Sequence, residues 1–293
     1  MEQLVREPDS RIADQAFHPS QAMSTKISSQ SAKVTRRTSP VEPLSLIALF
    51  GEQLEALYGL VQRSNYVFGS PLGPFHWQAR TYHVPRFVYF GPDASDAAVR
   101  LAFLAGFDHR DLRGTLALLH FVERLALKPD IGQGLNLSFF PLVDVLGLSG
   151  LGEDRALARQ SWTQTVAPEI DLLEKDARLR SYHGFVRVES APGEDAITVR
   201  LRTPAHEEHP TPGVELIAAD DVAPIPVRWE TASVDALADG PLTMADDQPF
   251  HPFELTLRIP AAWPAELYRE AVASILKRFV LRYRGIVAYG QNL

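Results

Sequence analysis

The chain has 293 residues, of which 45% are hydrophobic and 22% are charged, and its net charge is -7. This composition is typical of a globular protein and excludes a collagen-like chain. The negative charge leaves no electrostatic footprint for nucleic acid, so we expect no nucleic-acid partner. The chain has no cysteine, which excludes a disulfide framework and a Cys-ligated metal site. Any metal would rest on the nine histidines or on carboxylates.

The first 43 residues are polar, with a run rich in Ser, Thr, Lys and Arg at 23–40. Such a segment buries too little apolar area to offset its ordering entropy, so we predict a mobile tail over 1–43 and one folded domain over 44–293. It lacks the apolar stretch of a secretory signal, so we expect a cytoplasmic protein. Translation from Met23 instead of Met1 stays open. No apolar run reaches the roughly 18–20 residues that span a bilayer, so we expect no membrane partner.

Beyond residue 44 the sequence alternates between helical periodicity and short β-rich runs closed by Gly or Pro. In chain order we expect a helix over 44–63, strands over 82–92 and 99–107, a helix over 112–127, a strand over 135–143, a helix over 166–179, strands over 184–190 and 253–259, and a helix over 265–283. A strand, helix, strand succession implies a parallel pair. We therefore predict a three-layer α/β domain with a mostly parallel, twisted mixed sheet and helices on both faces.

Ligand sites in such sheets lie beyond the carboxyl ends of the strands. The segments to inspect are therefore 106–111, 144–150, 189–195 and 258–260. The run His206-Glu-Glu-His209 lacks the spacing of a helical zinc motif, so we interpret it as a loop.

Several of these segments contain short motifs that resemble, in the same order, those of a known protein family. Gly106-Phe-Asp-His-Arg-Asp111 follows a strand, Pro141–Gly147 follows the next one, and Phe253-Glu-Leu-Thr-Leu-Arg258 forms a later one. This succession resembles the core of the zinc carboxypeptidase superfamily, in particular the branch near succinylglutamate desuccinylase and aspartoacylase. In that family the corresponding runs read Gly-x-His-x-x-Glu, Pro-x-x-Asn-Pro-x-Gly and Pro-Phe-Glu-x-x-x-Glu.

The resemblance implies a zinc ion held by two imidazoles and a carboxylate, with a glutamate as general base. Here the ligand positions carry Asp108, Asp111 and Glu189, and the general-base position carries Arg258. Zinc is doubtful at an all-oxygen set, which suits a hard cation such as Mn²⁺ or Mg²⁺ better. A guanidinium stays protonated and cannot act as a base. We predict that Arg258 lies within hydrogen-bond reach of at least one of the three carboxylates.

Each of these residues also has a structural interpretation. Asp108 and Asp111 precede a helix and are suited to accept hydrogen bonds from its first amides, whereas Glu189 and Arg258 are open to surface positions. Further pocket candidates are two residues near the strand exits, a histidine just before a strand, and arginines of the kind that family enzymes use to hold a substrate carboxylate. They are His109, Asp144, His183, Arg110, Arg155 and Arg159.

Three functions remain open. The first is a degenerate carboxypeptidase-like protein that keeps the fold and a pocket, lacks zinc hydrolysis and binds a small molecule or a peptide terminus. The second is an active metallocarboxypeptidase or acyl-amide hydrolase with an altered metal site. The third is a structural interaction protein without a pocket.

Overall fold

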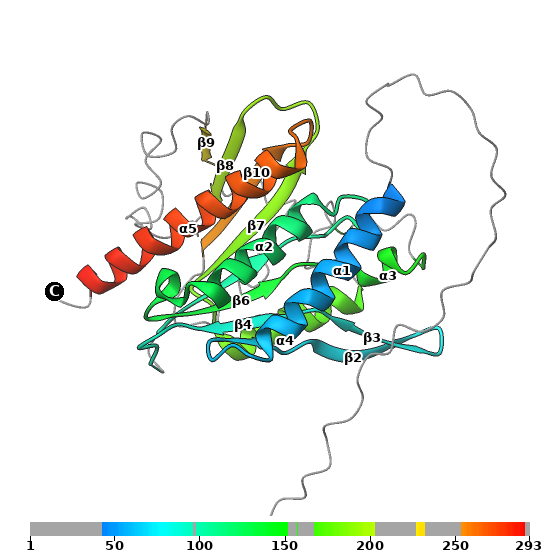
Figure 1. Cartoon of the computed structure of the whole chain (residues 1–293), viewed down its shortest axis with the longest axis horizontal. Coiled ribbons are helices and arrows are strands. Elements are labelled where there is room, and N and C mark those ends of the chain that lie inside the picture. The colour runs from blue at the N-terminus through cyan, green and yellow to red at the C-terminus, as the bar shows by residue number, and fades with distance from the viewer. Residues whose placement is uncertain are drawn as a thin grey trace, which may run out of the picture. The chain divides into compact units, whose positions relative to one another are not determined.

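The computed structural model describes residues 43–95, 98–151, 157, 167–202, 227–231 and 253–290. Its strands are β1 (Val67–Gly69), β2 (Leu72–Trp77), β3 (Arg80–Val84), β4 (Phe87–Phe90), β5 (Val99–Leu104), β6 (Leu135–Phe140), β7 (Gly184–Ala191), β8 (Ile197–Arg202), β9 (Val227–Thr231) and β10 (Phe253–Pro260). Eight of them form one sheet in the order β1-β4-β6-β5-β7-β10-β8-β9, while β2 and β3 form a separate hairpin. Figure 1 shows this arrangement.

The centre of the sheet is parallel. Strand β5 pairs in parallel with β6 and β7, and β7 pairs in parallel with β10. Antiparallel pairs flank this centre at β1–β4, β4–β6 and β10–β8, and β8–β9 is again parallel. All of β5 except Arg100 is buried, as expected for a strand covered on both faces. The prediction of a mostly parallel mixed α/β sheet is confirmed.

Helices lie on both faces of the sheet. They are α1 (Pro43–Val61), α2 (Arg113–Leu127), α3 (Val145–Leu148), α4 (Pro168–Arg180) and α5 (Ala265–Gly290), with a 3₁₀ turn at Pro129–Gly132. Figure 1 shows α1, α2 and α5 in front of the sheet. On that face Phe121 of α2 packs against Phe103 and Phe139. Alternation along β7 puts Phe185 on the opposite face, where it packs against Tyr182 at the end of α4.

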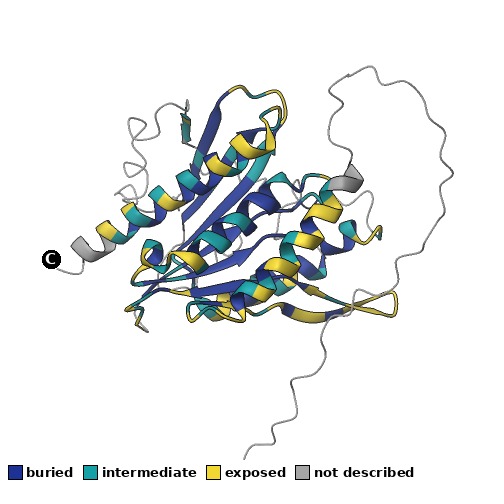
Figure 2. Cartoon of the chain, viewed as in Figure 1, coloured by how far each residue is buried: buried dark blue, intermediate teal, exposed yellow. Residues whose placement is uncertain are grey.

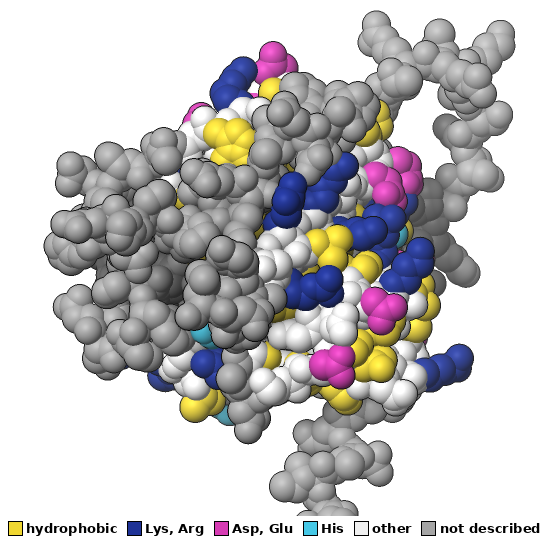
Figure 3. Space-filling model, turned by 90° about the vertical axis from the view of Figure 1, so that its left-hand side faces the viewer, with side chains coloured by type: hydrophobic (Ala, Val, Ile, Leu, Met, Phe, Trp, Pro, Cys, Tyr) yellow, Lys and Arg dark blue, Asp and Glu magenta, His cyan; other side chains and the backbone are white. Residues whose placement is uncertain are grey.

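Burial follows these layers. Figure 2 shows the central strands of the large sheet and the inner faces of the helices buried, and the outer face of α1 and the β2–β3 hairpin exposed. The outer surface is charged: on the face drawn in Figure 3, Lys and Arg side chains lie among acidic and hydrophobic ones. On α4, Lys175 pairs with Asp171 and Arg178 with Glu174, one helical turn apart.

The structure corrects some expected boundaries. The strand expected over 82–92 is two strands, because Pro85 lies between β3 and β4 and has no amide hydrogen for a sheet. Strands β1, β2, β8 and β9 and helix α3 were not expected. All described residues belong to one unit, Val41–Leu293. None of the described helices is long and apolar enough to cross a bilayer.

Several expectations concern other parts of the chain. Apart from Pro43, the expected tail over 1–43, with the start at Met23, lies outside the described residues. The loop expected at His206–His209 also lies outside them.

Candidate functional site

The carboxyl ends of β5 and β6 are joined by backbone hydrogen bonds. The amide of Val143 donates to the carbonyls of Ala105 and Gly106, and the amide of Asp144 donates to Gly106 at 2.8 Å. Gly106 has a φ of +66°, and a Cβ there would overlap Thr115 and the backbone at Pro141 and Leu142, so only glycine fits. This junction places the segment after β5 beside the segment after β6.

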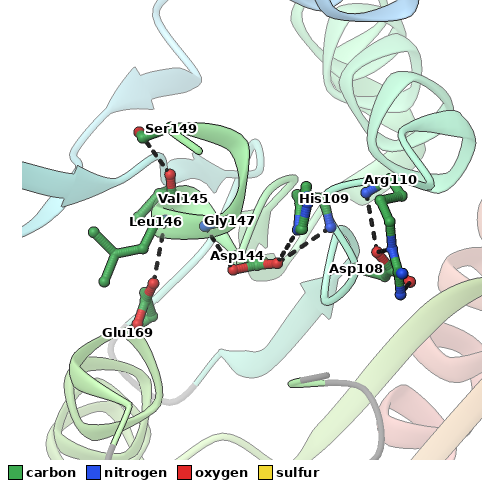
Figure 4. Close-up of polar contacts among 9 residues, drawn as sticks. All are labelled: Asp108, His109, Arg110, Asp144, Val145, Leu146, Gly147, Ser149 and Glu169. Carbon is green, nitrogen blue, oxygen red and sulfur yellow. Dashed lines mark hydrogen bonds and ion pairs between the residues drawn. The ribbon is translucent and has the colours of Figure 1, made fainter. Parts of the chain in front are cut away.

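Asp108, the first ligand position, is paired with its neighbour Arg110. Nε and Nη2 of Arg110 each lie 2.8 Å from an Asp108 carboxylate oxygen, and the Arg110 amide donates to Oδ1 at 3.0 Å. These hydrogen bonds from Arg110 lower the pKa of Asp108. Figure 4 shows the two side chains facing each other. Both carboxylate oxygens are therefore already engaged by a cation.

Asp111, the second ligand position, links two backbone segments. Its Oδ1 accepts from the amide of Arg113 at 3.3 Å, and its Oδ2 accepts from the amide of Ser190 at 3.2 Å. The Ser190 hydroxyl donates to the hydroxyl of Tyr268 on α5. Burial, reinforced by the charge of Asp111, raises the pKa of Tyr268. Asp111 thus accepts a hydrogen bond from an amide at the start of α2, as predicted for a carboxylate that precedes a helix. It also binds the backbone near the end of β7.

Glu189 and Arg258 are neighbours in the β7–β10 register, yet each is paired elsewhere. Glu189 forms an ion pair with Arg187, whose guanidinium lies 4.2 Å from the centre of the Phe107 ring. Arg258 lies 2.6 Å from Glu194, which also accepts from the Thr198 hydroxyl at 2.7 Å. Within the described residues, Arg258 has no hydrogen bond to the three carboxylates with which it was expected to pair. The turn between β7 and β8 supplies Glu194 instead.

These contacts do not fit a catalytic zinc ion. No group of three His, Asp or Glu side chains that could hold a metal is present among the residues described. The four positions carry three carboxylates and a guanidinium, so they offer no imidazole. Asp108 and Glu189 each face an arginine, and a cation would have to displace it.

His109 and Asp144, two of the pocket candidates, contact each other. Nδ1 of His109 lies 2.7 Å from Oδ2 of Asp144, and the His109 amide lies 3.3 Å from the same oxygen. Oδ1 of Asp144 accepts from the Gly147 amide at 3.0 Å and so begins α3. Asp144 is fully buried, whereas 16% of the His109 side chain is exposed. Figure 4 shows the pair between the two strand exits.

A substitution of Gly147 tests how closely this pair is enclosed. A Cβ at Gly147 would overlap both the Asp144 carboxylate and Nδ1 of His109. We expect Gly147→Ala to destabilise the fold by about 1–3 kcal/mol, because neither group can move without losing its hydrogen bonds. Urea unfolding measures this, with Gly51→Ala as control, since a Cβ at Gly51 meets nothing within 4 Å. Equal stability of the two variants would show that the pair moves freely.

Glu169 is a site residue that the sequence did not indicate. It is fully buried at the start of α4, and its Oε1 accepts from the Leu146 amide at 3.3 Å (Figure 4). An acidic residue in the first turn of a helix is common, so the sequence pattern predicts only an exposed glutamate there. Its burial depends on α3 packing against α4, which no local pattern encodes.

His183 lies at the other end of the sheet. It precedes β7, where its amide donates to the Arg100 carbonyl and its Nδ1 accepts from the Arg100 amide. The structure therefore does not bring it to the strand exits. Arg155 and Arg159, the other arginine candidates, lie outside the described residues.

The position of His183 predicts a pH effect. Burial, reinforced by the charge of Arg100, lowers the pKa of His183. A base whose pKa is lowered on folding favours the neutral form, so its contribution to stability is present above its unfolded pKa and is lost as the pH falls. We expect His183→Gln to reduce the loss of unfolding free energy between about pH 7.5 and about pH 5. Urea midpoints at the two pH values measure it, and an unchanged pH dependence would contradict the assignment.

Comparison with known proteins gives the fold but no close relative. No family model matches the sequence, and no curated protein matches it. The structure is similar to a metallo-carboxypeptidase from Burkholderia cenocepacia, with a TM-score of 0.61 and 13% identity over 80% of this chain and 69% of that one. It is also similar to bovine thrombin-activatable fibrinolysis inhibitor in complex with tick carboxypeptidase inhibitor, with a TM-score of 0.58 and 12% identity over 82% and 97% of the two chains. A metallo-carboxypeptidase from Pseudomonas aeruginosa gives a TM-score of 0.56 at 10% identity over 79% and 67%. The chain therefore has a metallocarboxypeptidase-like fold, as the sequence resemblance implied.

Proposed function

We propose that this protein is a degenerate member of the carboxypeptidase-like fold, which keeps the strand-exit site but does not hydrolyse substrates through zinc. One observation carries this proposal: three of the four positions that would hold the metal and the general base are engaged in ion pairs. Asp108 pairs with Arg110, Glu189 with Arg187 and Arg258 with Glu194.

The charge balance of these pairs supports the proposal. A metal ion needs open lone pairs, whereas Asp108 and Glu189 are each paired with a guanidinium and Asp111 accepts two backbone amides. A guanidinium at the general-base position cannot take a proton from water. The site is thus better suited to hold a small polar ligand or a peptide terminus than to activate a metal-bound water.

The alternative is an active metallocarboxypeptidase or acyl-amide hydrolase with an altered metal site. The names of the similar structures favour it, since they include metallo-carboxypeptidases. It requires that a hard cation open the Asp108–Arg110 and Glu189–Arg187 pairs on binding. That requirement gives the two functions different expected results.

A hydrolysis assay distinguishes them. Purified protein is incubated with Zn²⁺ or Mn²⁺ and with blocked dipeptides, N-acetylaspartate or N-succinylglutamate, and release of the free amino acid is measured. We expect no release above that in buffer with the same metal. Metal-dependent release that is lost in Asp108→Ala would establish the alternative function instead.

The remaining expectations stay predictions. They are a small molecule or a peptide terminus as ligand, no nucleic-acid or membrane partner, and a cytoplasmic location. An ion-pair site of this kind suits a ligand with both a donor and an acceptor group.

A further inference from the structure

The proposed function leaves the His109–Asp144 pair without a role. Both oxygens of Asp144 accept backbone amide hydrogens, Oδ1 from Gly147 and Oδ2 from His109. Nδ1 of His109 lies 2.7 Å from Oδ2, and an accepting oxygen requires that Nδ1 carry the hydrogen. The hydrogen-bond pattern therefore places a hydrogen on Nδ1, so in a neutral imidazole the lone pair lies on Nε2.

The second ring nitrogen, Nε2, is not engaged within the part of the chain that the structure describes. Among the described residues Nε2 has no hydrogen-bond partner, and part of the imidazole is exposed. The ring is also fixed in place, because Asp144 is fully buried and Gly147 leaves no free space beside Nδ1. In nucleophilic and general-base catalysis, a buried carboxylate commonly holds one nitrogen of an imidazole while the other nitrogen presents its lone pair to the substrate.

We propose that His109, positioned by Asp144, is a nucleophile for small activated esters. Nε2 attacks the carbonyl carbon, the bond from that carbon to the leaving oxygen breaks, and the alkoxide or phenolate departs. This leaves a cationic acylimidazolium, to which water then adds; the carbon–nitrogen bond breaks, the neutral imidazole is regenerated, and a carboxylate and two protons are released, one of which the alkoxide or phenolate can take up. The step needs only water as co-reactant, so it does not depend on whether the ligand positions bind a metal.

The substrate follows from the surroundings. Asp108 and Arg110 beside His109 pair with each other, so the adjacent charge is balanced and does not select a charged substrate. A small neutral ester therefore meets no unbalanced charge of this pair beside His109. p-Nitrophenyl acetate is therefore the substrate used to test it.

The experiment measures the release of p-nitrophenolate by the full chain in the presence of EDTA. We expect His109→Gln to lower the protein-dependent rate by about tenfold or more, because it removes the attacking nitrogen. Asp144→Asn should also lower it, because an amide cannot accept from both amides and hold Nδ1 as well. Mass spectrometry of a quenched reaction should find the acetyl group on His109.

His120→Gln is the matched control. His120 is nearly as buried as His109, with 19% of its side chain exposed, but each of its nitrogens lies 3.3 Å from a carboxylate, Glu123 or Glu270. We expect this variant to keep the wild-type rate. Equal rates for His109→Gln and the wild type would overturn the proposal. A rate abolished by EDTA would also overturn it, and restoration of that rate by zinc would overturn the proposed function as well.

A measurement on the wild-type protein tests the proposal even if the variants fail to fold. Long-range ¹H–¹⁵N correlation spectra of the wild type should show a protonated Nδ1 and an unprotonated Nε2 at His109 at about pH 8, well above the ordinary histidine pKa. The opposite tautomer would contradict the proposal without any substitution.

Discussion

Asp176→Asn is expected to cost about 3–5 kcal/mol of unfolding free energy, because it breaks a buried charge network. The Asp176 carboxylate pairs with Arg86 and Arg180 and accepts from the Tyr182 hydroxyl at 2.8 Å. Asp176 and Arg86 are both 6% exposed, so the substitution leaves the Arg86 guanidinium buried without its counter-charge. Urea unfolding at neutral pH measures the loss.

The same helix provides a control for Asp176. Glu174→Gln breaks the ion pair between Glu174 and Arg178, which are both exposed. Exposed pairs contribute little, so we expect a loss below about 1 kcal/mol. If Asp176→Asn also lost less than about 1 kcal/mol, the contacts of Asp176 would not stabilise the fold as a buried charge network should.

Arg187→Gln is expected to cost about 2–3 kcal/mol. Arg187 is buried, pairs with Glu189 and lies over the Phe107 ring, so the substitution removes a desolvated ion pair and a cation–π contact. Glu189 is partly exposed and recovers some hydration, which makes the expected loss smaller than that at Asp176.

Arg200→Gln is the control for Arg187. Both arginines flank Thr256 of β10 in register, so they lie on the same face of the sheet. The Arg200–Glu230 pair is 39% exposed on each side, and its loss should cost less than about 1 kcal/mol. Similar losses in the two variants would contradict the view that Arg187 is a buried part of the site.

The sequence predicted the central layers because their patterns are strong. The stripes of α2 and α5 and the apolar runs of β5, β6 and β7 give clear helical and buried-strand signals. Strand β8 was missed although it alternates buried Ile197, Val199 and Leu201 with polar residues. Strand β1 was missed because three residues carry too little pattern to detect.

The site was only partly predictable. Motifs that resemble those of the family directed attention to Asp108, Asp111 and Asp144, but the partners of these residues depend on how the loops meet. The His109–Asp144 contact follows from hydrogen bonds between the exits of β5 and β6, and the Arg258–Glu194 pair follows from the β7–β8 turn. Such long-range contacts leave no local sequence signal. The position of His183 could have been predicted from the sequence, because a residue that precedes a parallel strand lies at the end of the sheet opposite the strand exits.

The central claim is that the substituted ligand positions do not hold a catalytic zinc ion. The most direct test is the zinc content of the freshly purified full chain, measured by plasma mass spectrometry together with the melting temperature on addition of Zn²⁺. We predict a zinc content far below one equivalent and no rise in melting temperature. A content of about one zinc per chain that is lost in Asp108→Ala would contradict the account.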